Sequence, residues 1–174
     1  MEALLYIVKA LVTLLVIAFL LRLLLPLVRA DLRNPFGEAV LRLTNPLVLP
    51  LRKVLPPVRS FDVASLVALL LVQFAGTTVM HLLAGAGLRP ESILVGGLRE
   101  LLLTVLQFYF FAVLIYALLS WFSGAGYNPA ARMLARLVEP LLAPIRRIVP
   151  PLGGLDLSAV FLLIALQALQ ILLR

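Results

Sequence analysis

The side chains capable of chemistry are few and far apart in this sequence. Three glutamines, Gln73, Gln107 and Gln167, stand inside long apolar runs, and the one histidine, His81, follows the first of them. Serine, histidine and aspartate do not occur with the spacing of a nucleophilic triad, and the glycines do not form a phosphate-binding pattern. Cysteine is absent, which excludes thiolate metal sites and cysteine nucleophiles. We therefore expect no enzymatic activity, no metal site and no cofactor.

Two of the glutamines occupy matching places. Gln73 follows Asp62, and Gln167 follows Asp156, by eleven residues. If a helix begins at each aspartate, the glutamine lies about three turns further on, near the middle of a membrane. A polar side chain at that depth bonds across helices or lines a polar path. Gln107 can join either arrangement, and both alternatives stay open.

His81 is a weak candidate for a haem ligand because it stands alone. The three methionines, Met1, Met80 and Met133, offer no evident second axial ligand. A pair of histidine ligands would require a second copy of the chain or a partner.

Long apolar runs extend from one end of the chain to the other. Of 174 residues 63% are hydrophobic and 13% charged, and the mean hydropathy is +1.14; soluble domains carry about 25% charged residues. Four runs, residues 4–25, 63–83, 101–122 and 157–173, can cross or nearly cross a hydrocarbon core of about 30 Å. Within the first, Lys9 and Arg22 lie near opposite ends, from which long basic side chains can reach the headgroups. The predicted fold class is an all-α membrane protein with four transmembrane helices.

The basic residues predict the orientation of these spans. The net charge is +7, and ten of the fifteen Lys and Arg residues fall in two loops, between spans one and two and between spans three and four. They are Arg29, Arg33, Arg42, Arg52, Lys53 and Arg59 in the first loop and Arg132, Arg136, Arg146 and Arg147 in the second. Basic loops beside apolar spans are typical of the cytoplasmic side, so both termini are expected outside. This clustering favours a membrane over nucleic acid as the partner of the basic residues.

The chain repeats itself after 94 residues. This shift aligns Asn34-Pro35 with Asn128-Pro129, Arg42 with Arg136, Pro46 with Pro140, Arg52 with Arg146, Asp62 with Asp156, and Gln73 with Gln167. We expect one repeat over residues 1–84, an outer linker over 85–97 and a second repeat over 98–174. Because span one maps onto span three, the repeats are parallel, with a pseudo-twofold axis along the membrane normal.

Each basic loop carries an amphipathic segment. Apolar side chains recur at steps of three or four in residues 35–45, and in the second loop at Met133, Leu134, Leu137 and Leu141. This pattern is typical of a helix lying in the membrane interface, and a re-entrant segment that dips into the bilayer stays open as the alternative. Asn34 and Asn128 are candidate N-caps, and Pro46 and Pro140 are expected to restart a second short helix. Asp62 and Asp156 are candidate caps of spans two and four. Six basic residues are candidates to bind lipid headgroups or a partner: Arg42, Arg52, Lys53, Arg136, Arg146 and Arg147.

The paired segments NPFGEAVLRLTNPLVLPLRKVLPPVRSFD and NPAARMLARLVEPLLAPIRRIVPPLGGLDLS resemble the YggT family of bacterial and plastid membrane proteins. The first copy departs from the pattern at Arg59-Ser60, in place of Gly-Gly, and at Ala64, in place of serine. The resemblance implies a two-repeat protein of the bacterial inner membrane, linked to cell division, envelope shape and osmotic tolerance. For plastid relatives it implies assistance in attaching haem to a b-type cytochrome.

Three functions are compatible with these observations. The first is a non-enzymatic scaffold or assembly factor that docks a membrane or cytoplasmic protein, or anionic lipids, on its basic helices. The second is a channel or transporter component for ions or osmolytes, with the glutamines around a central path. The third is the haem-handling role. A homo-oligomer is compatible with each.

Overall fold

The computed structural model of the chain describes residues 2–30, 34–58, 61–122, 129–148 and 157–174. Over these residues it contains six α-helices: α1 (Glu2–Leu27), α2 (Pro35–Val54), α3 (Val63–Leu83), α4 (Pro90–Phe122), α5 (Pro129–Arg146) and α6 (Leu157–Leu173). In each repeat an amphipathic helix, α2 or α5, stands between two long apolar helices.

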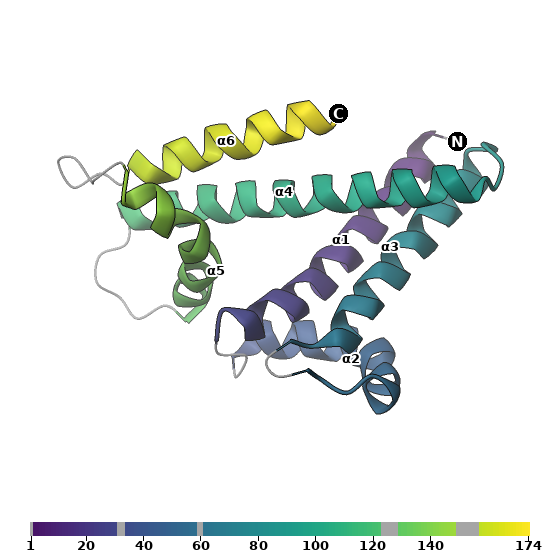
Figure 1. The fold of residues 1–174 in the computed structure, drawn as a ribbon, viewed down its shortest axis with the longest axis horizontal. Coiled ribbons are helices and arrows are strands. Elements are labelled where there is room, and N and C mark those ends of the chain that lie inside the picture. The colour runs from purple at the N-terminus through teal and green to yellow at the C-terminus, as the bar shows by residue number, and fades with distance from the viewer. Residues whose placement is uncertain (1, 31–33, 59–60, 123–128, 149–156) are drawn as a thin grey trace.

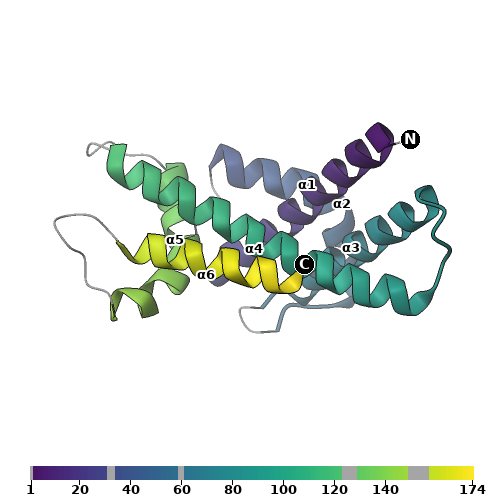
Figure 2. The same ribbon diagram turned by 90° about the horizontal axis from the view of Figure 1, so that it is seen from above.

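The two apolar helices of each repeat pack against one another. Figures 1 and 2 show α1 beside α3 and α6 beside α4, while α2 lies across the ends of α1 and α3 that are remote from the N-terminus. The N- and C-terminal ends of the described chain lie on the same side of the molecule, at the top of Figure 1. The two repeats meet where α4 packs on α1 and α3.

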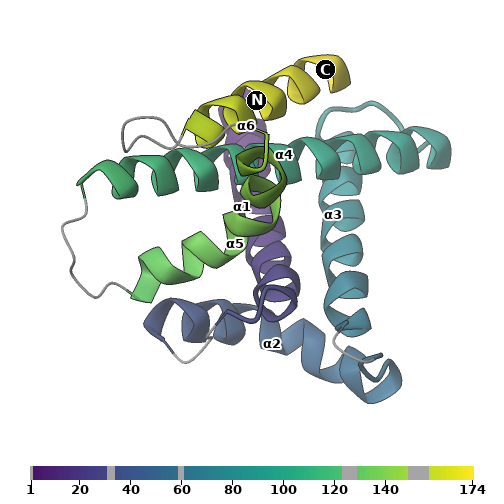
Figure 3. The same cartoon turned by 60° about the vertical axis from the view of Figure 1, so that its left-hand side comes forward.

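Three of the described helices are long and apolar enough to cross a membrane: α1, α3 and residues 90–119 of α4. Helix α6 is apolar but has 17 residues, which is about 26 Å of helix. The apolar helices do not form one parallel bundle, because α4 crosses α1 and α3 steeply (Figure 3). The structure therefore supports an all-helical protein with three spanning helices by length, and the fourth span stays a prediction.

Helix α4 begins well before the expected position. It starts at Pro90, so most of the predicted outer linker over 85–97 is helical. Gly96 and Gly97 fall within the predicted linker, but both lie inside the helix. At Gly97 the reason is packing, because a Cβ there would lie 2.8 Å from the ring of Phe74 on α3.

The expected second short helix in each basic loop is wrong. Helix α2 is continuous through Pro46 and Pro50, and α5 through Pro140 and Pro144. A proline within a helix removes one backbone hydrogen bond and bends the helix without ending it. Both helices are bent accordingly (Figure 3).

The core has a cluster within each repeat and one between them. Residues such as Val16, Ala64 and Ala68 are buried between α1 and α3, and Val113 and Leu142 are buried between α4 and α5. A third cluster joins the repeats through Leu25 and Val40 of the first and Met133 and Leu137 of the second. Many large apolar side chains stay exposed on the apolar helices, as a lipid-facing surface requires.

Candidate functional site

A buried arginine ties the first apolar helix to the amphipathic helix α2. Arg22 of α1 is 3% exposed. Its Nη1 donates hydrogen bonds to Thr44 Oγ1 at 3.0 Å and to Asn45 Oδ1 at 2.6 Å. The Thr44 hydroxyl in turn donates a hydrogen bond to the backbone oxygen of Val40 at 2.6 Å. The expectation that Arg22 reaches the headgroups is therefore wrong. Its charge is held inside the protein because α2 supplies acceptors at that depth.

The second repeat makes an equivalent connection between its apolar and amphipathic helices, with different residues. Tyr116 stands at the position of Arg22, and Glu139 at that of Asn45. Here the cation comes from the amphipathic helix: Arg146 donates to Glu139 Oε2 at 2.8 Å and to Tyr116 Oη at 3.1 Å. Both amphipathic helices are thus fixed to the first apolar helix of their repeat by a guanidinium.

Asp62 caps α3 and holds the end of α2 against it. Its Oδ1 accepts from the backbone N–H of Ser65 at 3.3 Å, its Oδ2 accepts from the Ser65 hydroxyl at 2.8 Å, and it forms an ion pair with Arg52. Burial alone raises the pKa of Asp62, but the hydrogen bonds from Ser65 and Arg52 outweigh it, so the pKa lies below its ordinary value.

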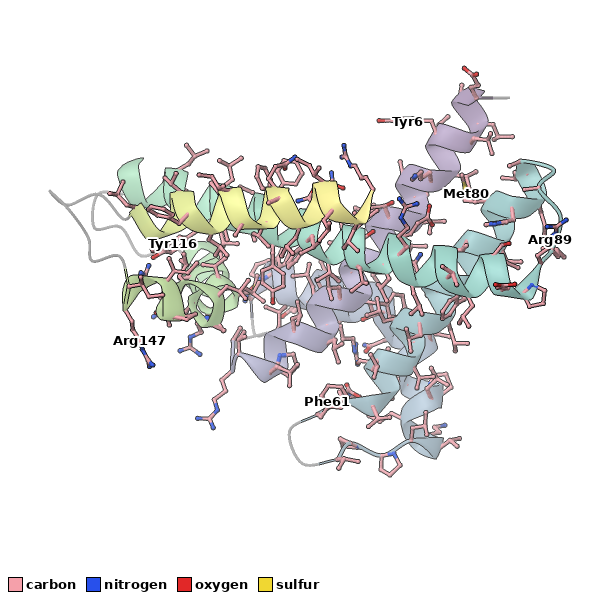
Figure 4. The ribbon with its side chains drawn as sticks, turned by 45° about the horizontal axis from the view of Figure 1, so that its top comes forward. Tyr6, Phe61, Met80, Arg89, Tyr116 and Arg147 are labelled. Atoms are coloured by element: carbon pink, nitrogen blue, oxygen red, sulfur yellow. The ribbon has the colours of Figure 1, made fainter. Side chains whose placement is uncertain are left out.

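The two members of each basic pair have different surroundings. Arg52, which is itself exposed, and Arg146 form ion pairs with Asp62 and Glu139, whereas Lys53 and Arg147 are exposed and form no ion pair with the described residues. Figure 4 shows Arg147 extending away from the ribbon. The side chain of Arg42 is 84% exposed and lies 3.6 Å from Glu38, one turn before it.

Two further candidate residues, Arg136 and Asn34, make contacts with other parts of the chain. Arg136 is exposed and donates to the backbone oxygen of Arg29 in the other repeat. Asn34 caps α2 by accepting from the backbone N–H of Gly37 at 2.9 Å. Its amide nitrogen lies 3.9 Å from the sulfur of Met133. The candidate caps Asn128 and Asp156 lie outside the described residues.

A polar cavity of about 230 Å³ lies between the repeats. Its polar lining residues come from α1, α3, α4, α6 and the residue after α6: Lys9, Thr13, Gln73, Glu100, Thr104, Gln107, Gln170 and Arg174. The structure thus brings Gln73 and Gln107 to one cavity. Gln167, however, is exposed on α6 and is not among its lining residues.

Gln170 takes the place expected for Gln167, and sequence reasoning missed it. The repeat offered a signal, because Gln170 aligns with Gly76, which lines the same cavity. Four pairs of lining positions are 94 residues apart: Lys9 and Leu103, Thr13 and Gln107, Gly76 and Gln170, and Met80 and Arg174. Both members of each pair face the cavity, so it lies where the equivalent faces of the two repeats meet.

A chain of polar contacts crosses one wall of this cavity. Gln73 Nε2 donates to Thr77 Oγ1 at 3.2 Å, and Thr77 donates to Glu100 Oε2 at 3.4 Å. The other carboxylate oxygen of Glu100 lies 3.8 Å from Lys9 Nζ. The amide nitrogen of Gln170 is buried and has no hydrogen-bond partner among the described residues. The cavity therefore combines charged groups of both signs with a donor that needs an acceptor.

His81 lies close to this polar region, on α3. Its Nδ1 is 2.9 Å from the backbone oxygen of Thr77. In the part of the chain that the structure describes, no three of His, Cys, Asp and Glu gather in a way that would hold a metal ion.

Apolar helices of membrane-spanning length and a twice-occurring helix–amphipathic helix–helix unit define the class, an all-helical membrane protein built from two repeats. The sequence profile of the CCB3/YggT family matches residues 1–83 and 95–174, one segment for each repeat. The chain therefore belongs to the CCB3/YggT family.

Relatives of this family align along nearly the whole chain. An uncharacterized protein of Pseudomonas aeruginosa is 38% identical over 98% of this chain and 87% of its own length. The protein named YggT of Escherichia coli K12 is 32% identical over 98% of this chain and 88% of its own length. The protein named ycf19 of Guillardia theta is 38% identical over 66 residues, which are 37% of this chain and 72% of its own. No solved structure matches.

Proposed function

We propose that this protein is a non-enzymatic membrane scaffold whose basic amphipathic helices dock an acidic partner protein at the cytoplasmic surface of the bacterial inner membrane. The observation that carries this proposal is the division of each basic pair. Arg52 and Arg146 bind acidic groups of the chain itself, while Lys53 and Arg147 stay exposed at equivalent positions.

The amphipathic helices have the surface of interfacial helices. On α2, Phe36 and Leu43 are about half exposed although they are large and apolar, and Arg42 and Lys53 are exposed on the same helix. Such a helix buries its apolar side chains at the boundary of the acyl chains and leaves its cations in the aqueous layer. Arg22 and Arg146 fix α2 and α5 to the apolar helices. Lys53 and Arg147 are therefore presented on a rigid support.

The proposal places the basic loops in the cytoplasm and both termini in the periplasm, as the positive-inside rule predicts. Electrostatic attraction of this kind acts mainly on association and weakens with salt. A link to cell division, envelope shape or osmotic stress rests on the family resemblance alone, and capture of a partner protein is the step that would connect the scaffold to such a process.

Charge reversal at the two exposed cations tests the scaffold. The full chain carrying Lys53→Glu and Arg147→Glu should lose the proteins that cross-link to the parent chain in cells, while its helical circular dichroism stays unchanged. The control is Arg89→Glu, which is also an exposed cation. Arg89 lies in the turn before α4, at the end of α3 that is remote from α2 (Figure 4). Equal cross-linking by both variants, or equal loss in both, would contradict docking at this surface.

Conduction is less well supported by the geometry. The polar cavity contains Gln73 and Gln107, as a path would require. Beyond Gln107, however, the lining changes to Ile17, Phe108 and Phe111, which gives an ion no ligands.

A further inference from the structure

The polar cavity continues into an apolar groove of about 300 Å³. Three residues, Thr13, Thr104 and Gln107, line both. From this junction the groove runs along α1 and α4 past Ile17, Phe108, Phe111 and Ile115 and reaches Leu134 of α5. The two spaces together form one elongated site that is polar at one end and apolar at the other.

The polar end collects opposite charges that only partly neutralise each other. Lys9 Nζ and Glu100 Oε1 are 3.8 Å apart, which is longer than a direct hydrogen bond. An adjoining pocket shares Lys9, Glu100 and Arg174 with the cavity and adds His81 and Arg99. An anionic group is therefore attracted here by several cations, and a cationic group by a single carboxylate.

Gln170 shows that an acceptor is missing in the wall. It is 6% exposed, and its Nε2 is buried without a partner among the described residues. An unsatisfied buried amide is unfavourable because it has lost its hydrogen bonds to water. A ligand oxygen in the cavity, reached by rotation of the amide, would remove that cost.

The apolar end opens to the surroundings of the protein. Phe111 is 50% exposed and Ile115 is 48% exposed, and both line the groove. Lys9 lies in the second turn of α1, near the end of that helix, whereas Ile17 lies two turns deeper. With α1 crossing the membrane, the polar end lies nearer the headgroups than Ile17, which then lies at the depth of the acyl chains.

We propose that this site binds a phospholipid with a zwitterionic headgroup. Its phosphate lies against Lys9 and Arg174, its ammonium against Glu100, and one acyl chain fills the groove. A small polar solute would leave the apolar groove empty, and a purely apolar ligand would make no use of Lys9, Glu100 and Arg174. An amphiphile carrying both charges satisfies both ends. This inference does not depend on the docking surface proposed above, because Lys53 and Arg147 are not lining residues of the cavity or the groove.

Native mass spectrometry of the full chain in detergent micelles tests the site. The probes are phosphatidylethanolamine, phosphatidylglycerol and soluble phosphorylethanolamine. Lys9→Ala with Arg174→Ala should lower the affinity for phosphatidylethanolamine by about tenfold or more, because charge-assisted hydrogen bonds are lost. Glu100→Gln should abolish the preference for phosphatidylethanolamine over phosphatidylglycerol. Arg29→Ala with Arg89→Ala, which removes the same number of exposed cations elsewhere, should leave binding unchanged.

Two further results decide the nature of the ligand. Thr104→Phe at the junction should block the acyl chain and reduce lipid binding while helical content is kept. Soluble phosphorylethanolamine should compete only at concentrations far above those of the lipid. Equal lipid binding by the parent chain and the Lys9/Arg174 variant would overturn the proposal. Competition by the soluble headgroup at lipid-like concentration would overturn it too, because the groove would then contribute nothing.

Discussion

The guanidinium of Arg22 lies 2.6 Å from the amide oxygen of Asn45, and this pair joins an apolar helix to an amphipathic one. In the second repeat the equivalent positions hold Tyr116 and Glu139, and Arg146 bridges them. The first repeat has a cation on both helices, Arg22 on α1 and Arg52 on α2. In the second repeat the apolar helix has Tyr116 instead, and Arg146, the equivalent of Arg52, makes the connection. Both repeats thus make this connection, but with different residues. This indicates that the fixed position of α2 and α5 matters more than the residues that produce it.

Loss of the Asn45 acceptor should destabilise the protein more than loss of Glu139. Asn45→Leu leaves the buried Arg22 with Thr44 alone, and its Nε already has no partner among the described residues. We expect a loss of about 3 kcal/mol in unfolding free energy, since a buried charge loses a partner. Glu139→Leu removes an acceptor that is half exposed and should cost under about 1 kcal/mol. Denaturant unfolding in micelles measures both, and equal losses would contradict the buried tie.

Acidification should weaken the contact between α2 and α3 through Asp62. The folded state lowers the pKa of this carboxyl, so its contribution is fully present above the unfolded pKa of about 3.9 and is lost as the pH falls through the lower folded pKa. The midpoint of thermal unfolding of the parent chain should therefore drop below about pH 4. In Asp62→Asn the drop should be smaller and the stability at neutral pH lower. An identical pH profile in the variant would show that Asp62 does not carry this dependence.

Gly76 on α3 should tolerate an added methyl group much less well than Gly96 on α4. A Cβ there would overlap Cγ1 of Val12 on α1, whereas one at Gly96 on α4 meets no atom within 4 Å. We expect Gly76→Ala to cost about 1–3 kcal/mol through overpacking. Gly96→Ala should be neutral or stabilise by up to about 1 kcal/mol, because alanine favours the helix. Thermal unfolding compares the two, and Val12→Ala combined with Gly76→Ala should recover much of the loss.

The orientation can be read by cysteine labelling, because the chain has no cysteine of its own. A membrane-impermeant maleimide should label Arg89→Cys in intact spheroplasts and should label Arg147→Cys only after the membrane is opened. Both side chains are exposed, which makes them a matched pair (Figure 4). Labelling of Arg147→Cys in intact spheroplasts would reverse the proposed orientation.

Much of the fold was predictable because it depends on local composition. The runs over 63–83 and 157–173 correspond to α3 and α6 residue for residue, since a helix in an apolar environment ends where charged or helix-breaking residues begin. The start of α4 was not predictable, because the tolerance of Gly97 inside a helix depends on Phe74, which is distant in sequence. The continuity of α2 and α5 through their prolines was not predictable for a similar reason. Tertiary packing stabilises a helix beyond a proline that would end the helix in isolation.

The candidate site was predictable only in part. The repeat pointed to Gln73 and Gln167 as a pair, yet Gln73 is buried and Gln167 is exposed. A shift of three residues along α6 brings Gln170 to the interior instead, and which face of an apolar helix turns inward cannot be read from a uniformly apolar sequence. Similarly, the burial of Arg22 follows from acceptors on α2 that lie more than twenty residues away.

The four pairs of equivalent positions around the polar cavity bear on why two repeats share one chain. Two identical subunits meeting at such a face would place the same side chain on both walls, so any ligand they bind would have to be symmetric or bind in two orientations. Fusion frees each copy to diverge. Here threonine faces glutamine, glycine faces glutamine, and methionine faces arginine. The two repeats therefore enclose an asymmetric cavity, which a homodimer of identical single repeats cannot offer.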